Sequence, residues 1–493
     1  MADGRTVMPS TERERDLQGF HATVKGLADT ILSRSRVTII GHVDADGISA
    51  ASIASIALKR AGIPCDVRLT KKLDENEINI INSRISDTFW LVDLGSGSSS
   101  KFTNKSVYIS DHHLPEKDLN TDSREGQRDI FSFEERHANP HLYGIDGSTE
   151  ISGAGVVYLT AKEMNNGNTD LATIAIVGAV GDLQDSAECR LRGLNRQVLD
   201  DAIHRDMMTM VKDIRIFGRE TRPLGKMLQF STDPILPGLT SDAVACNRYL
   251  MDLGIPLTDG EKWRCWIDLT KVEKAQVASA LCNHLLDSGS GNRACKRLIG
   301  EVYLLKSERI GTELHDAKEF STLLNACGRY GEGMVGLSIC AGDRGDKLEI
   351  GLRLQHNHRG NLADAINLVK DLGVERGRFI QHFHGRDEIL DSIVGIVAGM
   401  VLGSGEVPSD VPIVAFAYSE DEKVKVSARA TRELVQKGVD LAVAVKAASE
   451  KVGGTGGGHN IAAGATISIG KEQEFLAEME RLIERQMLGE LTS

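Results

Sequence analysis

The chain has 493 residues, enough to bury a large core and to form about two to four domains. Hydrophobic residues make up 41% and charged residues 26%, and no apolar run approaches the roughly 20 residues that a membrane-spanning helix needs. The net charge of −12 argues against a uniformly basic surface, although an acidic metal cluster can still meet substrate phosphates through its ions. The eight scattered cysteines form no CxxC pair, which argues against a zinc ribbon or a redox motif, and their density is too low for a disulfide framework, so we expect buried free thiols. We expect a cytoplasmic protein without a membrane anchor, because the charged N-terminus lacks a signal peptide's apolar core.

The first motif follows a short strand near the N-terminus. Residues 1–35 are expected to form an amphipathic helix, and the β-branched residues after it predict a strand. His42, Asp44 and Asp46 then occur at alternate positions before Gly47 opens a helix. Carboxylates and an imidazole this close together are costly to bury unless a positive charge lies between them, and such ligands suit Mn²⁺ or Mg²⁺. Taken alone, the motif predicts either a metal-binding turn or an Asp-rich surface turn.

Two later strands also end in polar side chains. Asp93 ends one buried strand, Asp111, His112 and His113 follow the next, and Asp182 follows an apolar helix. The expected strands are 36–40, 65–69, 88–94 and 105–110, and the expected helices are 50–61, 75–81, 151–164 and 171–180. Because strands and helices alternate, we expect a parallel, helix-covered sheet whose strands bring their polar ends to one edge.

The second half of the chain carries fewer motifs. Between 206 and 309 the pattern stops, and four basic residues there are candidates for a stripe that contacts DNA, with a solvated helix face as the favoured alternative: Arg215, Arg219, Arg222 and Lys226. After Gly345 the expected strands are 348–354, 411–418 and 423–428, and the expected helix is 441–452. The glycine run at 453–458 predicts a loop whose backbone N–H groups can approach a phosphate, with His459 as a further donor.

These motifs occur in the order found in one known superfamily. The DHH phosphoesterase superfamily has four motifs that resemble, in order, His42-x-Asp44-x-Asp46-Gly47, Asp93, Asp111-His112-His113 and Gly181-Asp182. Its DHH-associated C-terminal domain has a signature that resembles Gly456-Gly-Gly458-His459 followed by Ala462-Ala-Gly464. Within the superfamily the chain most resembles the archaeal RecJ-like nucleases, including the GINS-associated nuclease, through residues 147–152 and 317–329. The phosphatase and cyclic-dinucleotide branches tend to place three residues between the first His and the first Asp, whereas one residue separates them here.

The resemblance implies an α/β fold with three domains. A parallel-sheet DHH catalytic domain would span 1–205, with 310–345 returning to it. A mainly helical insert domain would span 206–309, and a C-terminal α/β DHH-associated domain that binds substrate would span 346–493. The active site is expected in the cleft between the catalytic and C-terminal domains, which separates the chemistry from the positioning of substrate.

The resemblance also implies a site for two divalent metal ions, with Mn²⁺ as the expected ion and Mg²⁺ as the alternative. One ion would be held by His42, Asp44 and Asp93, and the other by Asp46, Asp93, His112 and Asp182. Asp111 and His113 are the further catalytic residues that it implies, as supporting or substrate-contacting groups. The implied substrate and phosphate contacts are Ser427, Arg429, Gly456, Gly457, Gly458, His459, Asn325 and Arg329.

The function implied by the resemblance is that of a single-strand exonuclease in DNA replication or repair. It would hydrolyse phosphodiester bonds of single-stranded DNA, with RNA as a further substrate, to mononucleotides. One alternative is an oligoribonuclease or cyclic-dinucleotide phosphodiesterase. Another is a non-catalytic replication scaffold that binds GINS. The implied partners are single-stranded nucleic acid and GINS or another replication or repair protein, which would dock on the insert domain.

Overall fold

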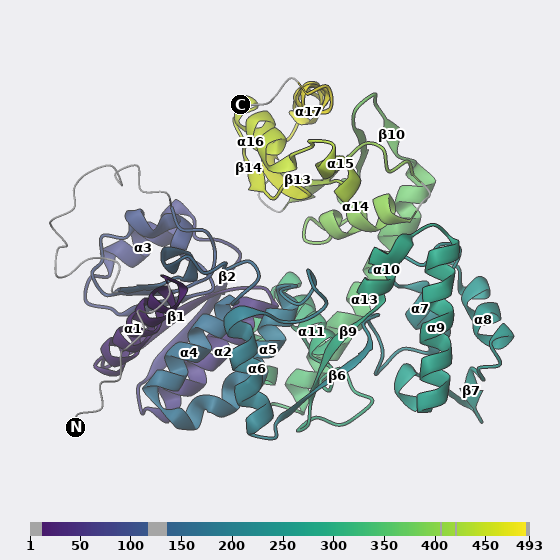
Figure 1. Ribbon diagram of the computed structural model, residues 1–493. Helices are drawn as coiled ribbons and strands as arrows, with labels where there is room; N and C mark the ends of the chain where they lie inside the picture. The colour runs from purple at the N-terminus through teal and green to yellow at the C-terminus, as the bar shows by residue number, and fades with distance from the viewer. Residues whose placement is uncertain (1–11, 117–135, 405–406, 420–421, 490–493) are drawn as a thin grey trace, which may run out of the picture. The chain divides into compact units, whose positions relative to one another are not determined.

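The computed structural model of the chain describes residues 12–116, 136–404, 407–419 and 422–489 (Figure 1). The chain forms two compact units. The first comprises Met1–Leu228 and Cys246–Gln355, and the second comprises Gln229–Ala245 and His356–Ser493. Among the described residues, no helix is both long enough and apolar enough to cross a membrane. The three expected domain boundaries stay predictions.

A five-stranded parallel sheet organises the first unit, which confirms the architecture predicted from the alternation of elements. The strand order is β2-β1-β3-β4-β5, and every neighbouring pair is parallel. The strands are β1 (Val37–His42), β2 (Cys65–Thr70), β3 (Phe89–Val92), β4 (Val107–Ser110) and β5 (His137–Ala138). Because all five strands run the same way, the polar residues that follow β1, β3 and β4 emerge at one edge of the sheet.

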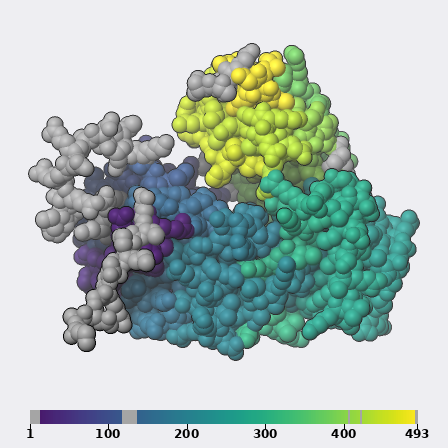
Figure 2. Space-filling model, viewed as in Figure 1, coloured from purple at the N-terminus to yellow at the C-terminus, as the bar shows by residue number. Residues whose placement is uncertain are grey.

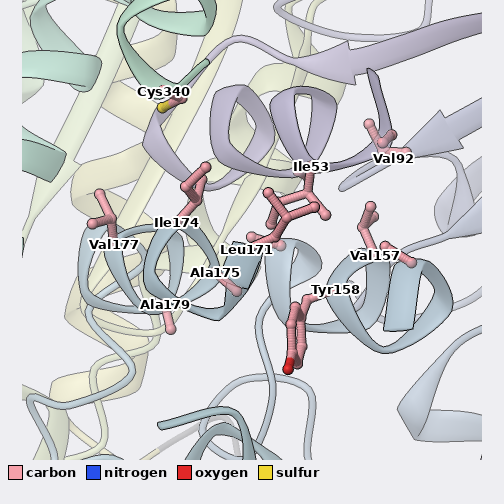
Figure 3. Packing of buried hydrophobic residues seen from close by; sticks show 14 of the residues in the cluster. Ile53, Val92, Val157, Tyr158, Leu171, Ile174, Ala175, Val177, Ala179 and Cys340 are labelled. Atoms are coloured by element: carbon pink, nitrogen blue, oxygen red, sulfur yellow. The ribbon is translucent and has the colours of Figure 1, made fainter. Parts of the chain in front are cut away.

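The central helix of this unit is α2 (Ala45–Arg60), which packs against β1, β2 and β3 and against four other helices. Its buried positions are mostly alanine, serine and isoleucine, so its neighbours approach closely. Figure 3 shows Ile53 of α2 close to Leu171 and Val157 within the hydrophobic core. The other helices around this sheet are α1 (Glu12–Leu32), α3 (Glu75–Ser83), α4 (Gly153–Met164), α5 (Ala172–Gly181), α6 (Gly193–His204), α11 (Ala317–Arg329) and α12 (Gly333–Cys340). Short 3₁₀ turns are η1 (Ser96–Lys101), η3 (Pro140–Tyr143) and η4 (Asn166–Leu171).

The insert begins and ends in a two-stranded antiparallel ribbon, in which β6 (Met208–Ile214) pairs with β9 (Ile299–Leu305). The segment between these strands is mainly helical, as expected. Its elements are α7 (Leu224–Gln229), α8 (Ala243–Asp252), β7 (Thr258–Asp259), β8 (Lys262–Trp263), η5 (Trp266–Asp268), α9 (Lys271–Asp287) and α10 (Gly291–Leu298).

Arg215 and Arg219 belong neither to an exposed basic stripe nor to a solvated helix face, so both expectations are wrong for these two residues. Both side chains are buried, and each guanidinium pairs with an acid from a distant part of the chain. Arg215 Nη2 lies 2.5 Å from Asp185 Oδ2, and Arg219 Nη1 lies 3.0 Å from Asp316 Oδ2. These arginines therefore hold the root of the insert against the parallel-sheet region and are not available to DNA.

The second unit contains a six-stranded mixed sheet with the order β10-β11-β12-β13-β15-β14. The strands are β10 (Glu375–Arg376), β11 (Gln381–His384), β12 (Ile413–Ser419), β13 (Lys423–Arg429), β14 (Thr455–Gly458) and β15 (Ala462–Ser468). The helices are α13 (Asp346–Leu372), which starts in the first unit, α14 (Val394–Gly403), α15 (Arg432–Gln436), α16 (Leu441–Lys451) and α17 (Glu472–Met487). Alternate residues of β12 enter two separate hydrophobic clusters, so both faces of this sheet are covered. The outer side of α17 faces solvent (Figure 2, yellow).

The strand predicted at 348–354 is wrong, because this stretch is part of the long helix α13. Leu348, Ile350, Leu352 and Leu354 alternate with polar residues, which mimics a strand. The same residues are also paired four apart, which suits a helix, and they pack against the main hydrophobic core of the first unit. A seven-residue stretch is too short to distinguish the two-residue period of a strand from the 3.6-residue period of a helix. Packing against the core of the first unit decides for the helix.

The buried Glu319 carboxylate of α11 makes the stability of the protein depend on pH. This carboxylate is 1% exposed and accepts hydrogen bonds from the Glu220 backbone N–H (2.8 Å) and the Thr221 hydroxyl (2.6 Å). Burial, and then the nearby Asp316 carboxylate, raises the pKa of Glu319 from 4.5 to about 8. Between these two values the native state binds more protons than the unfolded state, so this group makes stability fall as pH rises.

We expect Glu319→Gln to weaken this fall, because glutamine resembles the neutral acid. The slope removed is about 1.4 kcal/mol per pH unit across that interval. Urea unfolding of both proteins at pH 5, 6.5 and 8 measures it, with the exposed Glu261→Gln as control. If the free energy of unfolding changed with pH equally in wild type and Glu319→Gln, the raised pKa of Glu319 would be contradicted.

Candidate metal centre

The candidate ligands lie at the ends of neighbouring elements of the first unit. His42 is the last residue of β1, Asp44 is the N-cap of α2, and Asp46 lies in the first turn of that helix. The helix begins at Ala45, earlier than predicted, because Asp44 Oδ1 accepts a hydrogen bond from the Gly47 N–H (3.0 Å) and caps it. The remaining candidates follow β3, β4 or α5 directly: Asp93, Asp111, His112, His113 and Asp182.

The six predicted metal ligands form two adjoining groups. In each group, one nitrogen or oxygen atom per residue lies within 4.8 Å of the others. The groups are His42, Asp44 and Asp93, and Asp46, His112 and Asp182; a third group, Asp93, His112 and His113, overlaps both. His112 Nε2 lies 3.3 Å from Asp93 Oδ1, which joins the two groups. The fold therefore brings all six residues together, while their roles as ligands stay predictions.

Asp93 is the most constrained residue of the cluster. Its backbone φ is 58°, a left-handed conformation that is costly for a residue other than glycine. Its side chain is 1% exposed, and neither carboxylate oxygen has a hydrogen-bond partner among the described residues. Burial, and then the carboxylates of Asp46 and Asp44, raises the pKa of Asp93 well above its usual range. A cation between these carboxylates would remove the penalty, so the residues present fit a divalent metal.

Asp46 is held by the start of a helix that the sequence analysis did not connect to the site. Its Oδ2 accepts a hydrogen bond from the Gly153 N–H (2.7 Å) and its Oδ1 accepts one from the Ala154 N–H (3.0 Å). These are the first residues of α4, whose positive end favours a carboxylate. Ser152, the N-cap of α4, is the sequence signal that could have located this support.

His112 is oriented by the backbone so that one ring nitrogen faces the acids. Its Nδ1 lies 2.7 Å from the carbonyl oxygen of Gly147, which accepts the ring N–H. Its Nε2 then faces Asp93 at 3.3 Å, and Asp46 and Asp182 at 3.7 Å each. This is the tautomer that a metal-binding imidazole needs, because the carbonyl fixes the proton on the nitrogen away from the site.

Asp111 and His113 form a supporting pair beside the ligands. Asp111 is fully buried, and its Oδ1 accepts hydrogen bonds from the His112 N–H and from His113 Nδ1, each at 2.8 Å. Oδ1 also accepts from the His113 backbone N–H at 3.2 Å, and Oδ2 accepts from the Ser96 N–H at 2.9 Å. Partial burial lowers the pKa of His113, but the hydrogen bond to Asp111 outweighs this and raises the pKa to about 9. Asp111 is occupied in orienting its neighbours, whereas the His113 side chain is 55% exposed.

Helix α11 packs directly on the turn that carries Asp44. Asn325 Oδ1 accepts a hydrogen bond from the Ala45 N–H (3.0 Å), so this amide holds the turn in place. A Cβ atom at Gly328 would lie 1.8 Å from the Val43 carbonyl oxygen, so only glycine permits this approach. Burial lowers the pKa of Arg329, with the nearby Asp44 opposing the shift. Phosphate binding by Asn325 and Arg329 stays a prediction.

The remaining candidates lie in the second unit. Ser427 and Arg429 are on β13, and burial lowers the pKa of Arg429. The glycine run expected as a loop is instead largely an edge strand, because 455–458 form β14, which pairs with β15. Gly458 has a φ of 143°, and its Cβ would lie 2.7 Å from the Ala462 carbonyl oxygen, so a side chain there would strain the pairing. His459 follows this strand and is exposed. Phosphate binding by this group, Gly456, Gly457, Gly458, His459, Ser427 and Arg429, stays a prediction.

Comparison with known proteins covers nearly the whole chain. The model of the DHH family, N-terminal domain matches residues 36–179, that of the DHH-CID domain matches 216–299, and that of the DHHA1 domain matches 380–485. An uncharacterized protein of Methanocaldococcus jannaschii is 30% identical over 483 residues, which are 96% of this chain and 99% of that protein.

Solved structures share the fold at low sequence identity. RecJ from Thermus thermophilus, in complex with Mn²⁺, has a TM-score of 0.56 and 16% identity; the match covers 95% of this chain and 55% of that one. CDC45 from Entamoeba histolytica has a TM-score of 0.62 and 12% identity, covering 95% of this chain and 99% of that one. An exonuclease RecJ bound to manganese has a TM-score of 0.52 and 16% identity, covering 96% of this chain and 97% of that one. The chain therefore belongs to the DHH superfamily and combines a DHH domain, a DHH-CID domain and a DHHA1 domain.

Proposed function

We propose that the protein is a metal-dependent exonuclease that hydrolyses phosphodiester bonds of single-stranded DNA, and of RNA, to mononucleotides. One observation carries the proposal: the buried Asp93 carboxylate has no hydrogen-bond partner among the described residues and lies between two groups of candidate ligands. Two divalent ions, Mn²⁺ or Mg²⁺, suit these oxygen and imidazole ligands. The RecJ structures with bound Mn²⁺ support the choice of ion.

The residues have separate tasks in this proposal. His42, Asp44 and Asp93 would hold one ion, and Asp46, Asp93, His112 and Asp182 the other. Two such ions supply positive charge to the attacking and departing oxygens of a phosphodiester. Asp111 holds Nδ1 of His113, which leaves the Nε2 of this exposed ring to donate a hydrogen bond to a substrate phosphate. Phosphate binding by Arg429 and by the backbone N–H groups of β14, in the second unit, is part of the same proposal.

A non-catalytic scaffold that binds GINS through the insert is the second candidate. The likeness to CDC45 favours it, since that structure is matched over 99% of its length. A scaffold has no need of a buried carboxylate without a hydrogen-bond partner among the described residues, surrounded by further potential ligands, so this cluster favours the enzyme. An oligoribonuclease or cyclic-dinucleotide phosphodiesterase does not account for the DHH-CID insert at 216–299.

We expect the wild-type protein to degrade a single-stranded DNA oligonucleotide in the presence of Mn²⁺. Asp46→Ala should reduce the rate by more than about 100-fold, because losing a direct ligand exceeds the 10–100-fold typical of a supporting residue. A time course with 5′-labelled and 3′-labelled oligonucleotides measures the rate and the polarity.

Matched RNA, duplex DNA and a cyclic dinucleotide serve as further substrates in the same assay. Hydrolysis of only the cyclic dinucleotide or short RNA would favour the second enzyme class. No hydrolysis of any substrate by a folded wild type that binds Mn²⁺ would refute the exonuclease proposal and favour the scaffold.

Gly153→Ala is expected to weaken Mn²⁺ binding by roughly 10–100-fold, as for other disturbed supporting contacts. A Cβ at this position would lie 2.3 Å from Asp93 Oδ1 and must push that carboxylate away. Isothermal titration with Mn²⁺ measures the affinity. The matched control is Gly26→Ala in α1, where a Cβ meets no atom within 4 Å. Equal Mn²⁺ affinity in Gly153→Ala and Gly26→Ala would contradict a metal centre at Asp93.

A further inference from the structure

Gln184 is a buried amide beside the candidate metal centre that no motif identifies. It follows α5 two residues after Asp182, and its side chain is 2% exposed. Its Nε2 group donates toward Asp182 Oδ2 (2.9 Å), the Gly147 carbonyl (2.8 Å) and the Ile151 carbonyl (3.1 Å). An amide nitrogen surrounded by three oxygen acceptors is a donor site, and one of these acceptors is a candidate ligand.

The orientation of this amide is determined by its other end. Gln184 Oε1 accepts a hydrogen bond from Asn195 Nδ2 (2.5 Å). Flipping the Asn195 amide would lose a hydrogen bond, because its Oδ1 accepts one from the Ser152 N–H (3.3 Å). If the Gln184 amide were flipped, its NH₂ group would face the NH₂ group of Asn195. Its carbonyl oxygen would then face the Asp182 carboxylate and the Gly147 carbonyl, both of which are acceptors. The network therefore keeps the Gln184 donors toward Asp182.

The same network connects two candidate ligands of one group. The Gly147 carbonyl accepts from Gln184 and also from the ring N–H of His112 (2.7 Å). Leu183, between Asp182 and Gln184, has a φ of 59°, so the backbone turns sharply at this point. A left-handed leucine is costly and persists only where surrounding contacts require it. At this position the turn allows the Gln184 amide to donate to the Asp182 carboxylate.

We propose that Gln184 is a positioning residue for one of the two metal ions. It holds the Asp182 carboxylate toward His112 and Asp46, and Asn195 holds Gln184 in turn. This inference rests on the two-ion centre of the proposed function. The Asp182 side chain is 32% exposed, so without the amide its carboxylate is free to rotate toward solvent, and the ion must then order it on binding.

The test is direct Mn²⁺ binding to the full chain, measured by the EPR signal of free Mn²⁺ and by isothermal titration. Gln184→Met retains the size of the side chain and removes its donors. We expect wild type to bind two ions, and Gln184→Met to bind one as wild type does and the other roughly 10–100-fold more weakly. Asn195→Ala should weaken the same ion by a smaller factor.

Gln381→Met is the matched control. Gln381 is 1% exposed and donates to two backbone carbonyls, those of Pro408 (2.7 Å) and Val411 (3.2 Å), in the second unit. Its replacement should cost stability without changing Mn²⁺ binding. In single-strand hydrolysis, Gln184→Met should need more Mn²⁺ for half-maximal rate, by the same factor as the binding constant, and should approach the wild-type rate when Mn²⁺ is saturating.

Wild-type Mn²⁺ affinities for both ions in Gln184→Met would overturn the inference. If circular dichroism shows that Gln184→Met does not fold, Asn195→Ala decides, and unchanged binding in that variant overturns the inference as well. A wild type that binds two ions but hydrolyses no nucleic acid refutes the proposed function, while the binding data still decide the role of Gln184. A wild type that binds fewer than two ions refutes both.

Discussion

The buried carboxylate of Asp93 is the constraint on which the rest of the first unit depends. It lies among other acids, has no hydrogen-bond partner among the described residues, and stands on a left-handed backbone. An ionised carboxylate in this position is costly, and either protonation or a bound cation would remove the cost. The candidate ligands and the backbone donors around them lie at the ends of parallel strands and at the starts of helices, where the proposed cation site would form.

Close packing around the candidate ligands explains several glycines that have no side chain to contribute. A Cβ at Gly153 would contact Asp93 Oδ1 at 2.3 Å, and one at Gly178 would contact Asp46 Oδ1 at 2.5 Å. A Cβ at Gly147 would lie 2.1 Å from the His112 carbonyl oxygen. The backbones of helices α4 and α5 and of the loop before α4 therefore approach the candidate ligands closely, so that N–H and C=O groups orient Asp46 and His112 directly.

The insert is joined to the same region by buried charge pairs. Arg215, directly after β6, pairs with Asp185, the residue next to Gln184. Breaking one partner of such a pair would leave an uncompensated buried charge, at a cost of about 3–5 kcal/mol. The root of the insert and the turn that carries Asp182 are thus held as one piece, which gives the insert a structural task apart from any partner that it binds.

The sequence by itself determined the parallel sheet, the combination of a DHH domain, a mainly helical insert and a DHH-associated C-terminal domain, and the set of residues that the fold gathers into one cluster. The sheet and the cluster follow from strand ends, which are local and which a parallel sheet brings to one edge. Only the tertiary structure decided that Arg215 and Arg219 are buried, because their acidic partners lie far along the chain. It also decided that 348–354 is helical, since a short pattern fits two periods until its packing partner is known. It decided that 455–458 is an edge strand, because a glycine run has no periodic pattern and becomes a strand by pairing with β15. The hydrogen bonds that hold Asp46 and Asp182 also depend on the tertiary structure. Asp46 accepts from the start of α4, which is distant in the sequence, and Asp182 meets Gln184 only because the backbone turns sharply at Leu183.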